Sequence, residues 1–397
     1  MRGIRWVGYG IVAFIVVLAL VVSPASIRAR TAKDKDEPPL WRVPIKQLAH
    51  VSIAFRLCIY CLQIDYIDDS TLAVTLLTTD MSTSALKTGA PGVSGPYKYR
   101  MTFLDAKSGQ VRATHDWESP MMYFHIMPTH NGKFIVETFG EITLYSQEFV
   151  ALQRLKFAEP GFLSSNIDRV VLSWDGRTFC IASARSNEMT VKLFDADTFA
   201  PISSWSTSLP SPMWFVAASD DGVAVSSDNK ASFASVDHPW RTLFTGAKDP
   251  ILSLLSVNFA NNDVLLMTRG NRVIGVDRGG AQLFQTELNP KQFSLATRSS
   301  RGGHAFMAQT DDFLLAYQSQ FAIPASMATA PDEIGVYDSR NGHAIFHRSV
   351  LAQNERPIGS IAISPDANFV AVLSGGLGNQ TDGTVEVFRI PQVDGVN

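Results

Sequence analysis

One pattern of apolar and polar positions repeats along this chain of 397 residues, and it is clearest between Ser360 and Ile390. An alternating run that contains Ile361 and Ile363 leads into turn residues 364–366, which are followed by a second apolar run, a Gly-rich loop and a third apolar run. Alternation with a period of two, bounded by turn residues, is typical of β-strands joined in hairpins. The pattern predicts a β unit, and weaker copies of it fill the rest of the chain.

Two columns of turn residues recur in register. The first column places an apolar residue before a polar one at the end of a strand, in Leu104-Asp105, Tyr145-Ser146, Phe194-Asp195, Val236-Asp237, Val276-Asp277, Tyr337-Asp338 and Phe388-Arg389. An Asp carboxylate at this position can accept hydrogen bonds from backbone N–H groups two or three residues later, which closes a hairpin. The second column lies earlier in each unit, at residues 68–70, 130–132, 175–176, 220–222, 261–263, 301–303 and 365–366.

The spacing of these columns predicts a fold. Successive copies of the first column are 40 to 61 residues apart, and a period of about 40 to 50 residues is that of the blades of a β-propeller. In the sixth unit, residues 304–309 and 313–318 are both candidates for the second strand. The recurring aromatic residues are expected to fill the layers between blades; they are Phe103, Tyr145, Phe194, Tyr337 and Phe388.

The last unit is incomplete. It ends at its third strand, Thr384 to Ile390, so a four-stranded blade would lack its outer strand. The apolar stretch from Leu40 to Leu48 is the candidate for that strand, and by pairing with the last blade it would close the ring and remove an open edge. The sequence therefore predicts an all-β fold, a seven-bladed β-propeller over residues 40–397 that is closed by an N-terminal strand.

The N-terminal residues have a different composition. Arg2 and Arg5 precede an uncharged apolar segment from Trp6 to Val22, and small residues follow up to Ala25, which is the order of an export signal. The segment is slightly shorter than the about 20 residues of a spanning helix. We predict a signal peptide or signal anchor over residues 1–25 and a linker over residues 26–39. The body is then expected in the periplasm or the extracellular space, or anchored to a membrane with the propeller outside the cytoplasm.

Three segments of the chain carry a resemblance to known proteins. SPDANFVAVLSG, WDGRTFCIASA and TVKLFDADT resemble the WD-repeat-like and YVTN-type β-propellers, and the resemblance covers about Leu40 to Ile390. The Gly-His and terminal Trp-Asp dipeptides of true WD repeats are absent from their expected places, and Trp174-Asp175 lies in a different turn. Propellers similar to the YVTN type include lactone hydrolases and quinoprotein-like dehydrogenases. The resemblance therefore implies a propeller, with an enzyme that acts at the central channel as one alternative.

Composition and motifs exclude several kinds of site. A formal charge of −3 gives no basic surface for nucleic acid. The sequence contains no Gly-x-Ser-x-Gly, His-Glu-x-x-His or phosphate-binding Gly-rich motif, so we predict no catalytic residue, cofactor or metal ligand. The carboxylate pairs at 68–69, 220–221 and 311–312 lie in predicted turns, whose chemistry explains them. His125 is expected in the core or at its rim.

Cys58 and Cys61 form a C-x-x-C pair. Leu62 follows them, so the haem-attachment motif is not met, and three cysteines are too few for a four-thiolate zinc site. The pair is either two small apolar core residues or a disulfide, and a disulfide would need a tight turn because residues three apart along a strand lie too far from each other.

Three long loops join predicted second and third strands in units that would be neighbours around a closed ring. They span Thr78 to Arg100, about Ser319 to Glu333, and Ser374 to Gly383. Loops on a rigid scaffold often carry binding residues, although long loops also vary in length at little entropic cost. The candidate binding residues are Tyr97, Lys98, Tyr99, Phe321, Asn379 and Gln380.

The predicted function is that of an exported binding or interaction module, which uses the face with the long loops to bind an unidentified protein or small molecule. Two alternatives stay open at this stage. One is a propeller enzyme of lactonase-like or quinoprotein-like type, and the other is a structural protein of the cell envelope that is tethered through residues 6–22.

Overall fold

In a computed structural model the chain divides into two compact units, Met1–Pro38 and Pro39–Asn397. The structure describes residues 38–49, 62–78, 97–119, 125–138, 140–157, 167–173, 175–185, 188–208, 214–227, 229–246, 251–258, 263–268, 272–287, 305–307, 314–318, 332–338, 344–350, 358–366, 368–374 and 383–391. The predicted signal segment, most of the linker, Cys58 and Cys61 lie outside these ranges. Within them, no helix is both long and apolar enough to cross a membrane.

The described strands form seven four-stranded antiparallel sheets. The first sheet contains β2 (Leu62–Asp68), β3 (Thr71–Leu77), β4 (Tyr97–Asp105) and β5 (Val111–Ser119); the second contains β6 (His125–Pro128), β7 (Phe134–Thr138), β8 (Glu141–Tyr145) and β9 (Ala151–Lys156); the third contains β10 (Ile167–Leu172), β11 (Thr178–Arg185), β12 (Glu188–Asp195) and β13 (Pro201–Ser208). In each of these sheets the strands lie side by side in chain order.

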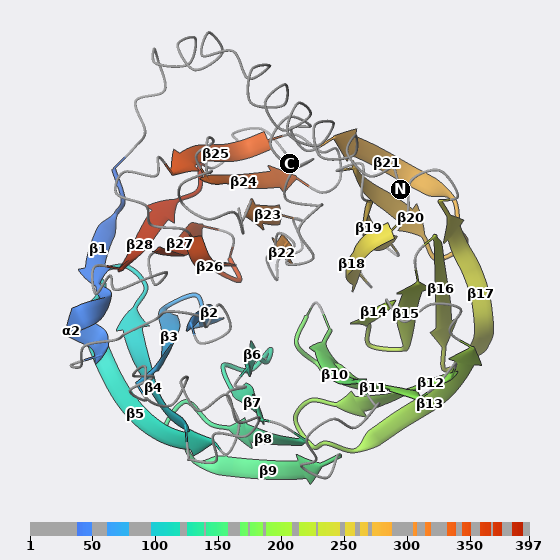
Figure 1. Ribbon diagram of the computed structural model, residues 1–397, viewed down its shortest axis with the longest axis horizontal. Helices are drawn as coiled ribbons and strands as arrows, with labels where there is room; N and C mark the ends of the chain where they lie inside the picture. The colour runs from blue at the N-terminus through green and yellow to red at the C-terminus, as the bar shows by residue number, and fades with distance from the viewer. Residues whose placement is uncertain are drawn as a thin grey trace, which may run out of the picture. The chain divides into compact units, whose positions relative to one another are not determined.

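The same order holds in the next three sheets. The fourth contains β14 (Trp214–Ala218), β15 (Gly222–Ser227), β16 (Lys230–Ser235) and β17 (His238–Thr245); the fifth contains β18 (Ile251–Asn258), β19 (Asp263–Thr268), β20 (Arg272–Asp277) and β21 (Gln282–Glu287); the sixth contains β22 (Ala305–Met307), β23 (Leu314–Gln318), β24 (Asp332–Asp338) and β25 (Ala344–Val350). Figure 1 shows the sheets arranged around a common centre, with the first strand of each sheet nearest to it.

The last sheet joins the two ends of the described chain. It contains β26 (Ile358–Ile363), β27 (Phe369–Ser374), β28 (Thr384–Arg389) and, as its outer strand, β1 (Trp41–Pro44). Trp41 pairs with Val387 and Pro44 with Thr384. Main-chain hydrogen bonds continue on both sides of this ladder, from Leu40 N to Val387 O at 2.7 Å and from Ile45 N to Gly383 O at 2.8 Å.

The stretch predicted as one strand from Leu40 to Leu48 is only half a strand. Pro44 has no N–H to donate to a ladder, and the chain continues as the short helix α2 (Ile45–Ala49). The helix buries Ile45 and Leu48, which are 4% and 2% exposed. Two of the apolar residues that suggested a longer strand, Ile45 and Leu48, are therefore buried by one turn of helix against the core.

The predicted turns agree with the observed ends of the strands at all but one position. All seven copies of the first column lie at the end of the third strand of a sheet or directly after it. Six copies of the second column lie between first and second strands. The sixth copy, at residues 301–303, is wrong, because Ala305–Met307 is the first strand of its sheet and Leu314–Gln318 is the second. This settles the ambiguity between the two candidate segments.

The core lies between neighbouring sheets. One cluster combines buried residues of the first, second and last sheets, and others join the second to the third, the third to the fourth and the fourth to the fifth. Phe103, Phe194 and Phe388 are buried as predicted, and Tyr145 is partly buried against Phe134. The side chain of Tyr337 is outside the described part. The sheets in these clusters therefore bury apolar side chains against their neighbours.

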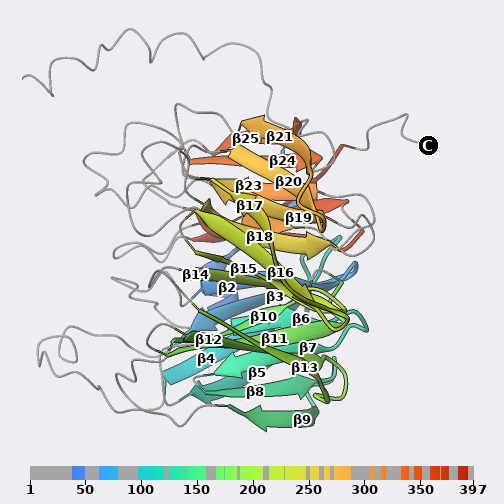
Figure 2. The same ribbon diagram turned by 90° about the vertical axis from the view of Figure 1, so that its right-hand side faces the viewer.

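Antiparallel pairing gives each sheet two different ends. Turns between first and second strands and between third and fourth strands lie at the same end, which we call the turn end. The second strand ends and the third strand begins at the opposite end of each sheet, which we call the loop end. In the side view of Figure 2, the strands run between these two ends.

Candidate functional site

The predicted binding residues of the first long loop belong largely to a strand. Tyr97, Lys98 and Tyr99 begin β4, so the loop ends earlier than predicted. Tyr99 pairs with Leu77 and is 1% exposed, so its side chain lies in the core and cannot serve as a surface contact. Phe321, Asn379 and Gln380 lie outside the described residues.

Tyr97 and Lys98 have different environments at the loop end. Tyr97 is partly buried and packs against the core cluster of the first sheet. The Lys98 side chain is 64% exposed, and its Nζ lies 4.0 Å from the Glu118 carboxylate on β5. Lys98 can therefore face a partner at the base of the loop, and a binding role for these two residues stays a prediction.

The turn end is built from Asp side chains in the way that the sequence predicts. Asp105 Oδ1 accepts hydrogen bonds from Lys107 N at 3.0 Å and from Ser108 N and Oγ at 2.9 Å. Asp195 repeats this arrangement with Asp197 N at 3.1 Å, Thr198 N at 2.8 Å and Thr198 Oγ1 at 2.7 Å. The bond from Arg112, together with those from Ser108, lowers the pKa of Asp105 to about 2. These carboxylates fix the turns between third and fourth strands.

A second turn motif, not foreseen from the sequence, is a buried Ser two residues before an Asp. Ser173 Oγ donates to Asp175 Oδ1 at 2.8 Å and accepts from Thr178 N at 3.0 Å. Ser364 repeats both contacts, with Asp366 at 2.5 Å and with Phe369 N at 2.9 Å. Ser219 donates to Asp221 at 3.0 Å. The recurring Ser-x-Asp spacing at these turns is the signal that could have revealed it.

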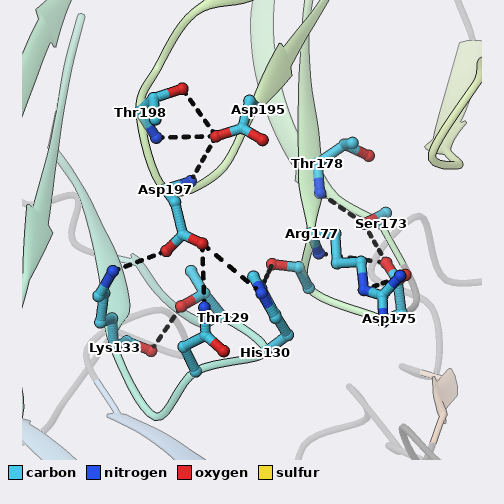
Figure 3. Close-up of polar contacts among 12 residues, drawn as sticks. Thr129, His130, Lys133, Ser173, Asp175, Arg177, Thr178, Asp195, Asp197 and Thr198 are labelled. Atoms are coloured by element: carbon cyan, nitrogen blue, oxygen red, sulfur yellow. Dashed lines mark hydrogen bonds and ion pairs between the residues drawn. The ribbon is translucent and has the colours of Figure 1, made fainter.

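The turns also bond across from one sheet to the next, most extensively between the second and third sheets. Asp197 accepts hydrogen bonds from Lys133 Nζ at 2.8 Å and Asn131 Nδ2 at 3.0 Å. His130 Nε2 lies 3.5 Å from the same carboxylate. Figure 3 shows Asp197 between the side chains of Lys133 and His130, with the Ser173–Asp175 turn beside them. The Asp197 carboxylate of the third sheet is thus contacted by three side chains of a single turn of the second sheet.

Similar links join the other described turns. They are Asp366 N to Asp69 Oδ1 at 2.7 Å, Gln147 Nε2 to Asp68 Oδ2 at 2.9 Å, Thr178 Oγ1 to Ser219 O at 2.9 Å, and Arg278 Nη1 to both Asp221 oxygens at 3.0 Å. Burial and the neighbouring Asp175 carboxylate raise the pKa of Asp220 to about 6. Two of the three predicted carboxylate pairs are therefore engaged in turns and sheet junctions, and the third, at 311–312, lies outside the described residues.

Tryptophan side chains of outer strands dock on the next sheet, a role that sequence reasoning missed. Trp41 Nε1 donates to Ala106 O in the first sheet at 2.8 Å, and Trp205 Nε1 donates to Ser235 O in the fourth sheet at 3.3 Å. The Trp117 ring lies 5.1 Å from that of Phe149 in the second sheet. Trp41, on β1, therefore makes the same kind of contact as the tryptophans of ordinary outer strands.

The inner edge of the first and second sheets holds a polar group of four residues, Gln63, Asp65, His125 and Glu137. Gln63 Nε2 donates to Asp65 Oδ2 at 2.5 Å and to Ile126 O at 2.8 Å. His125 Nδ1 lies 3.5 Å from Glu137 Oε2, and 41% of the His125 side chain is exposed. His125 is thus a rim residue with a buried carboxyl group beside it.

The described residues offer no group of three His, Cys, Asp or Glu side chains that is arranged to hold a metal ion. Cys180, which lies on β11, is a free, buried thiol, and burial raises its pKa to about 12. A thiol with so high a pKa is a poor nucleophile, because the thiolate is the reactive form. Cys180 is therefore a core residue of the third sheet.

Comparison with known proteins gives information about the fold only. No protein-family model matches the sequence, and no curated protein is significantly similar to it. Among solved structures, the chain is similar to one from the mitotic checkpoint complex, with a TM-score of 0.53, 12% identity, and coverage of 91% of this chain and 97% of that chain. It is also similar to one from BBS1N in complex with ARL6DN, with a TM-score of 0.51, 9% identity, and coverage of 91% and 98%. Both similar structures are β-propellers, and the chain therefore has a β-propeller fold.

Proposed function

We propose that this protein is an exported interaction module that binds a partner protein at its loop end. The observation that carries the proposal is the contrast between the two ends of the ring. At the turn end, short turns direct their carboxylates into their own backbones and into neighbouring sheets, as Asp105, Asp197 and Asp221 do. At the loop end, β3 and β4, β23 and β24, and β27 and β28 are joined by the long connections. Loops on a rigid scaffold are where binding residues concentrate.

The similar structures support the general class of function. One comes from a complex of BBS1N with ARL6DN and the other from the mitotic checkpoint complex, so both structures are of protein complexes. We infer from this that a partner protein is the favoured ligand. Export follows from the apolar segment at residues 6–22 and its flanking residues, and it is part of the proposal.

We further propose that the seven sheets are the complete set of blades and that β1 closes the ring. The β1–β28 ladder supports closure, because it gives the last sheet a fourth strand from the other end of the chain. The docking of Trp41 on Ala106 supports it as well. A closed ring places the connections of the first, sixth and last sheets next to one another, which makes one continuous binding sector.

The binding proposal is tested by exchanging the first long loop. Residues 82–96 are replaced by a short Gly-Ser linker, and tagged intact and exchanged proteins are used to capture partners from an extract of the source cells. Lys107→Ala, at an exposed position of the turn end, is the matched control. We expect the exchanged protein to keep its unfolding temperature and to lose a partner that the intact and Lys107→Ala proteins both capture. Equal capture by all three would refute the assignment to this loop, and loss with Lys107→Ala alone would move the binding site to the turn end.

A further inference from the structure

At their inner edges, the first and second sheets are joined by the Gln63 side chain, whose amide bonds to the main chain of Ile126 as a neighbouring strand would. Gln63 Oε1 accepts from Ile126 N at 3.0 Å, and Gln63 Nε2 donates to Ile126 O at 2.8 Å. β2 and β6 belong to different sheets and share no ladder, so this reciprocal pair takes the place of two main-chain bonds. The remaining N–H of the Gln63 amide is directed to Asp65 Oδ2 at 2.5 Å. Asp65 therefore fixes the orientation in which the amide can bond to Ile126.

Charges from both sheets surround this contact. His125 directly precedes Ile126 on β6, and its Nδ1 lies 3.5 Å from Glu137 Oε2 on β7. The Glu137 side chain is only 5% exposed, so its carboxyl group lies in a poorly solvated position beside the imidazole. Asp65 brings a second carboxyl group from the first sheet, and its charge acts on His125.

The other strands that pack against β2 contribute no charge. β3, β26 and β27 read TLAVTLL, IGSIAI and FVAVLS, which contain no acidic or basic residue. On β2 itself, the remaining titratable groups are Tyr66 and Asp68. The pKa of Tyr66 is raised by burial and, to a lesser degree, by the charge of Asp366. Asp68 bonds to Gln147 at the turn end. Among the described residues, the charge balance of the contact is set by Asp65, His125 and Glu137.

We propose that Gln63, Asp65, His125 and Glu137 form a proton-operated latch between the first two sheets, which holds when the group is protonated and loosens as it loses protons. His125 is the first residue of β6, and it follows a connection between sheets at the loop end. Loosening of the latch should therefore change the loop end and its affinity for a partner. That consequence rests on the proposed function, whereas the latch itself does not.

The directions of the pKa shifts agree on the sign. Burial raises the pKa of Asp65 to about 7, against the opposing effects of His125 and Gln63. Burial lowers the pKa of His125, but the hydrogen bond and charge of Glu137, together with the charge of Asp65, outweigh it and raise the pKa overall. Both groups hold protons more tightly in the closed latch than in an open state. The stability that they contribute is complete at low pH, declines as the pH rises through Asp65's pKa of about 7, and continues to decline through the raised pKa of His125.

Hydrogen exchange of the full chain measures this directly. Exchange of the amides in β2 and β6 is followed by mass spectrometry at pH 5.5, 6.5, 7.5 and 8.0 and corrected for the intrinsic rate at each pH. Release of one proton on opening should increase the opening constant up to about tenfold per pH unit. Asp65→Asn should flatten most of this dependence, because the amide cannot ionise. Asp116→Asn, on the outer strand β5, should leave it unchanged.

Two outcomes would overturn the latch. One is a corrected exchange rate in β2 and β6 that is constant from pH 5.5 to 8.0, and the other is the same pH dependence in Asp65→Asn as in the unaltered protein. If Asp65→Asn does not fold, Glu137→Gln replaces it, and it should move the onset of loosening to lower pH by removing the charge that favours protonated His125. Partner capture at pH 5.5 and 8.0 tests the consequence separately. A latch that responds in exchange while capture is constant would refute the link to binding and leave the latch intact.

Discussion

Replacement of Trp41 by alanine should weaken the junction between the last and first sheets. Two interactions are lost. The first is the hydrogen bond from Nε1 to Ala106 O at 2.8 Å, which is worth about 1 kcal/mol net. The second is the packing of the indole on Gly109, where a Cβ placed on the glycine would lie 2.8 Å from the ring. Because Trp41 is partly buried, we take about half of the ~3–5 kcal/mol typical of a buried Trp→Ala change.

The free energy of unfolding should therefore fall by about 2–4 kcal/mol in Trp41→Ala and by only about 1 kcal/mol in Trp41→Phe, which keeps an aromatic ring but has no N–H donor. Urea unfolding followed by far-ultraviolet circular dichroism measures both changes. Hydrogen exchange in β28 should increase in Trp41→Ala, because β1 is held less firmly against it. Trp240→Ala is the control, since Trp240 bonds to Ser206 O at 2.8 Å between the third and fourth sheets and should leave β28 unaffected. A loss below about 0.5 kcal/mol in Trp41→Ala would refute this reasoning.

Three further predictions concern the turn end. Asp105→Asn should lower the stability at pH 7 by about 1 kcal/mol, because the partly exposed pair with Arg112 is screened by solvent. Because the pKa of Asp105 is lowered to about 2, the stability that its charge contributes is complete above the ordinary carboxyl range and is lost as the pH falls through 2. The free energies of unfolding of the two proteins should therefore converge near that pH. A difference that stays constant with pH would contradict the ion pair. Gly109→Ala should cost about 2–3 kcal/mol, since its φ of +71° is strained for alanine and a Cβ would meet Trp41. Gly280→Ala, with a φ of +94° and a nearest contact of 3.1 Å, should cost about 1–2 kcal/mol by the same urea assay, and equal costs would show that Trp41 is not the obstacle.

The positions of most strands could be predicted from the sequence, because residues close together in the chain determine where those strands end. The pairs at the ends of third strands, such as Phe194-Asp195, combine a strand residue with a side chain that bonds to its own turn, and both properties are local. The sixth sheet was predicted wrongly because the local signal is missing there. Its first strand, β22, has only three residues and is too short to show alternation. The Gly-rich residues before β22 then suggested a turn at the wrong place.

The candidate site was less accessible to sequence reasoning. Tyr99 was assigned to a loop, although it continues the alternation that buries Met101 and Phe103. The extension of β4 to Tyr97 depends on pairing with β5, in which Arg100 meets Asp116 at 2.7 Å, and such a partner 16 residues away is not specified locally. Asp65 and Glu137 are 72 positions apart in the sequence, and only the packing of the first sheet against the second brings them to one edge.

Two turns contain an aromatic residue where the sequence of the turn alone would predict glycine. Phe149 and Phe199 have φ values of 63° and 57° in turns where Gly109 and Gly280 occupy the comparable positions of other sheets. A side chain in this left-handed region costs roughly 1 kcal/mol. The Phe199 ring packs edge-on against Phe179 at 5.1 Å, and Phe149 lies 4.6 Å from Phe103. These ring contacts, within the third sheet for Phe199 and between the first and second sheets for Phe149, offset the strain. Turn propensity alone would have predicted glycine.

The central claim is that β1 completes the last sheet and closes the ring. It is tested most directly by urea unfolding of two shortened chains, one that begins at Pro39 and one that begins at His50 and so lacks β1 and α2. We predict that the chain from Pro39 unfolds at the midpoint of the full chain, that the chain from His50 unfolds at a clearly lower midpoint, and that a peptide of residues 38–49 added in excess restores the higher value. Identical midpoints for the two shortened chains would contradict closure by β1.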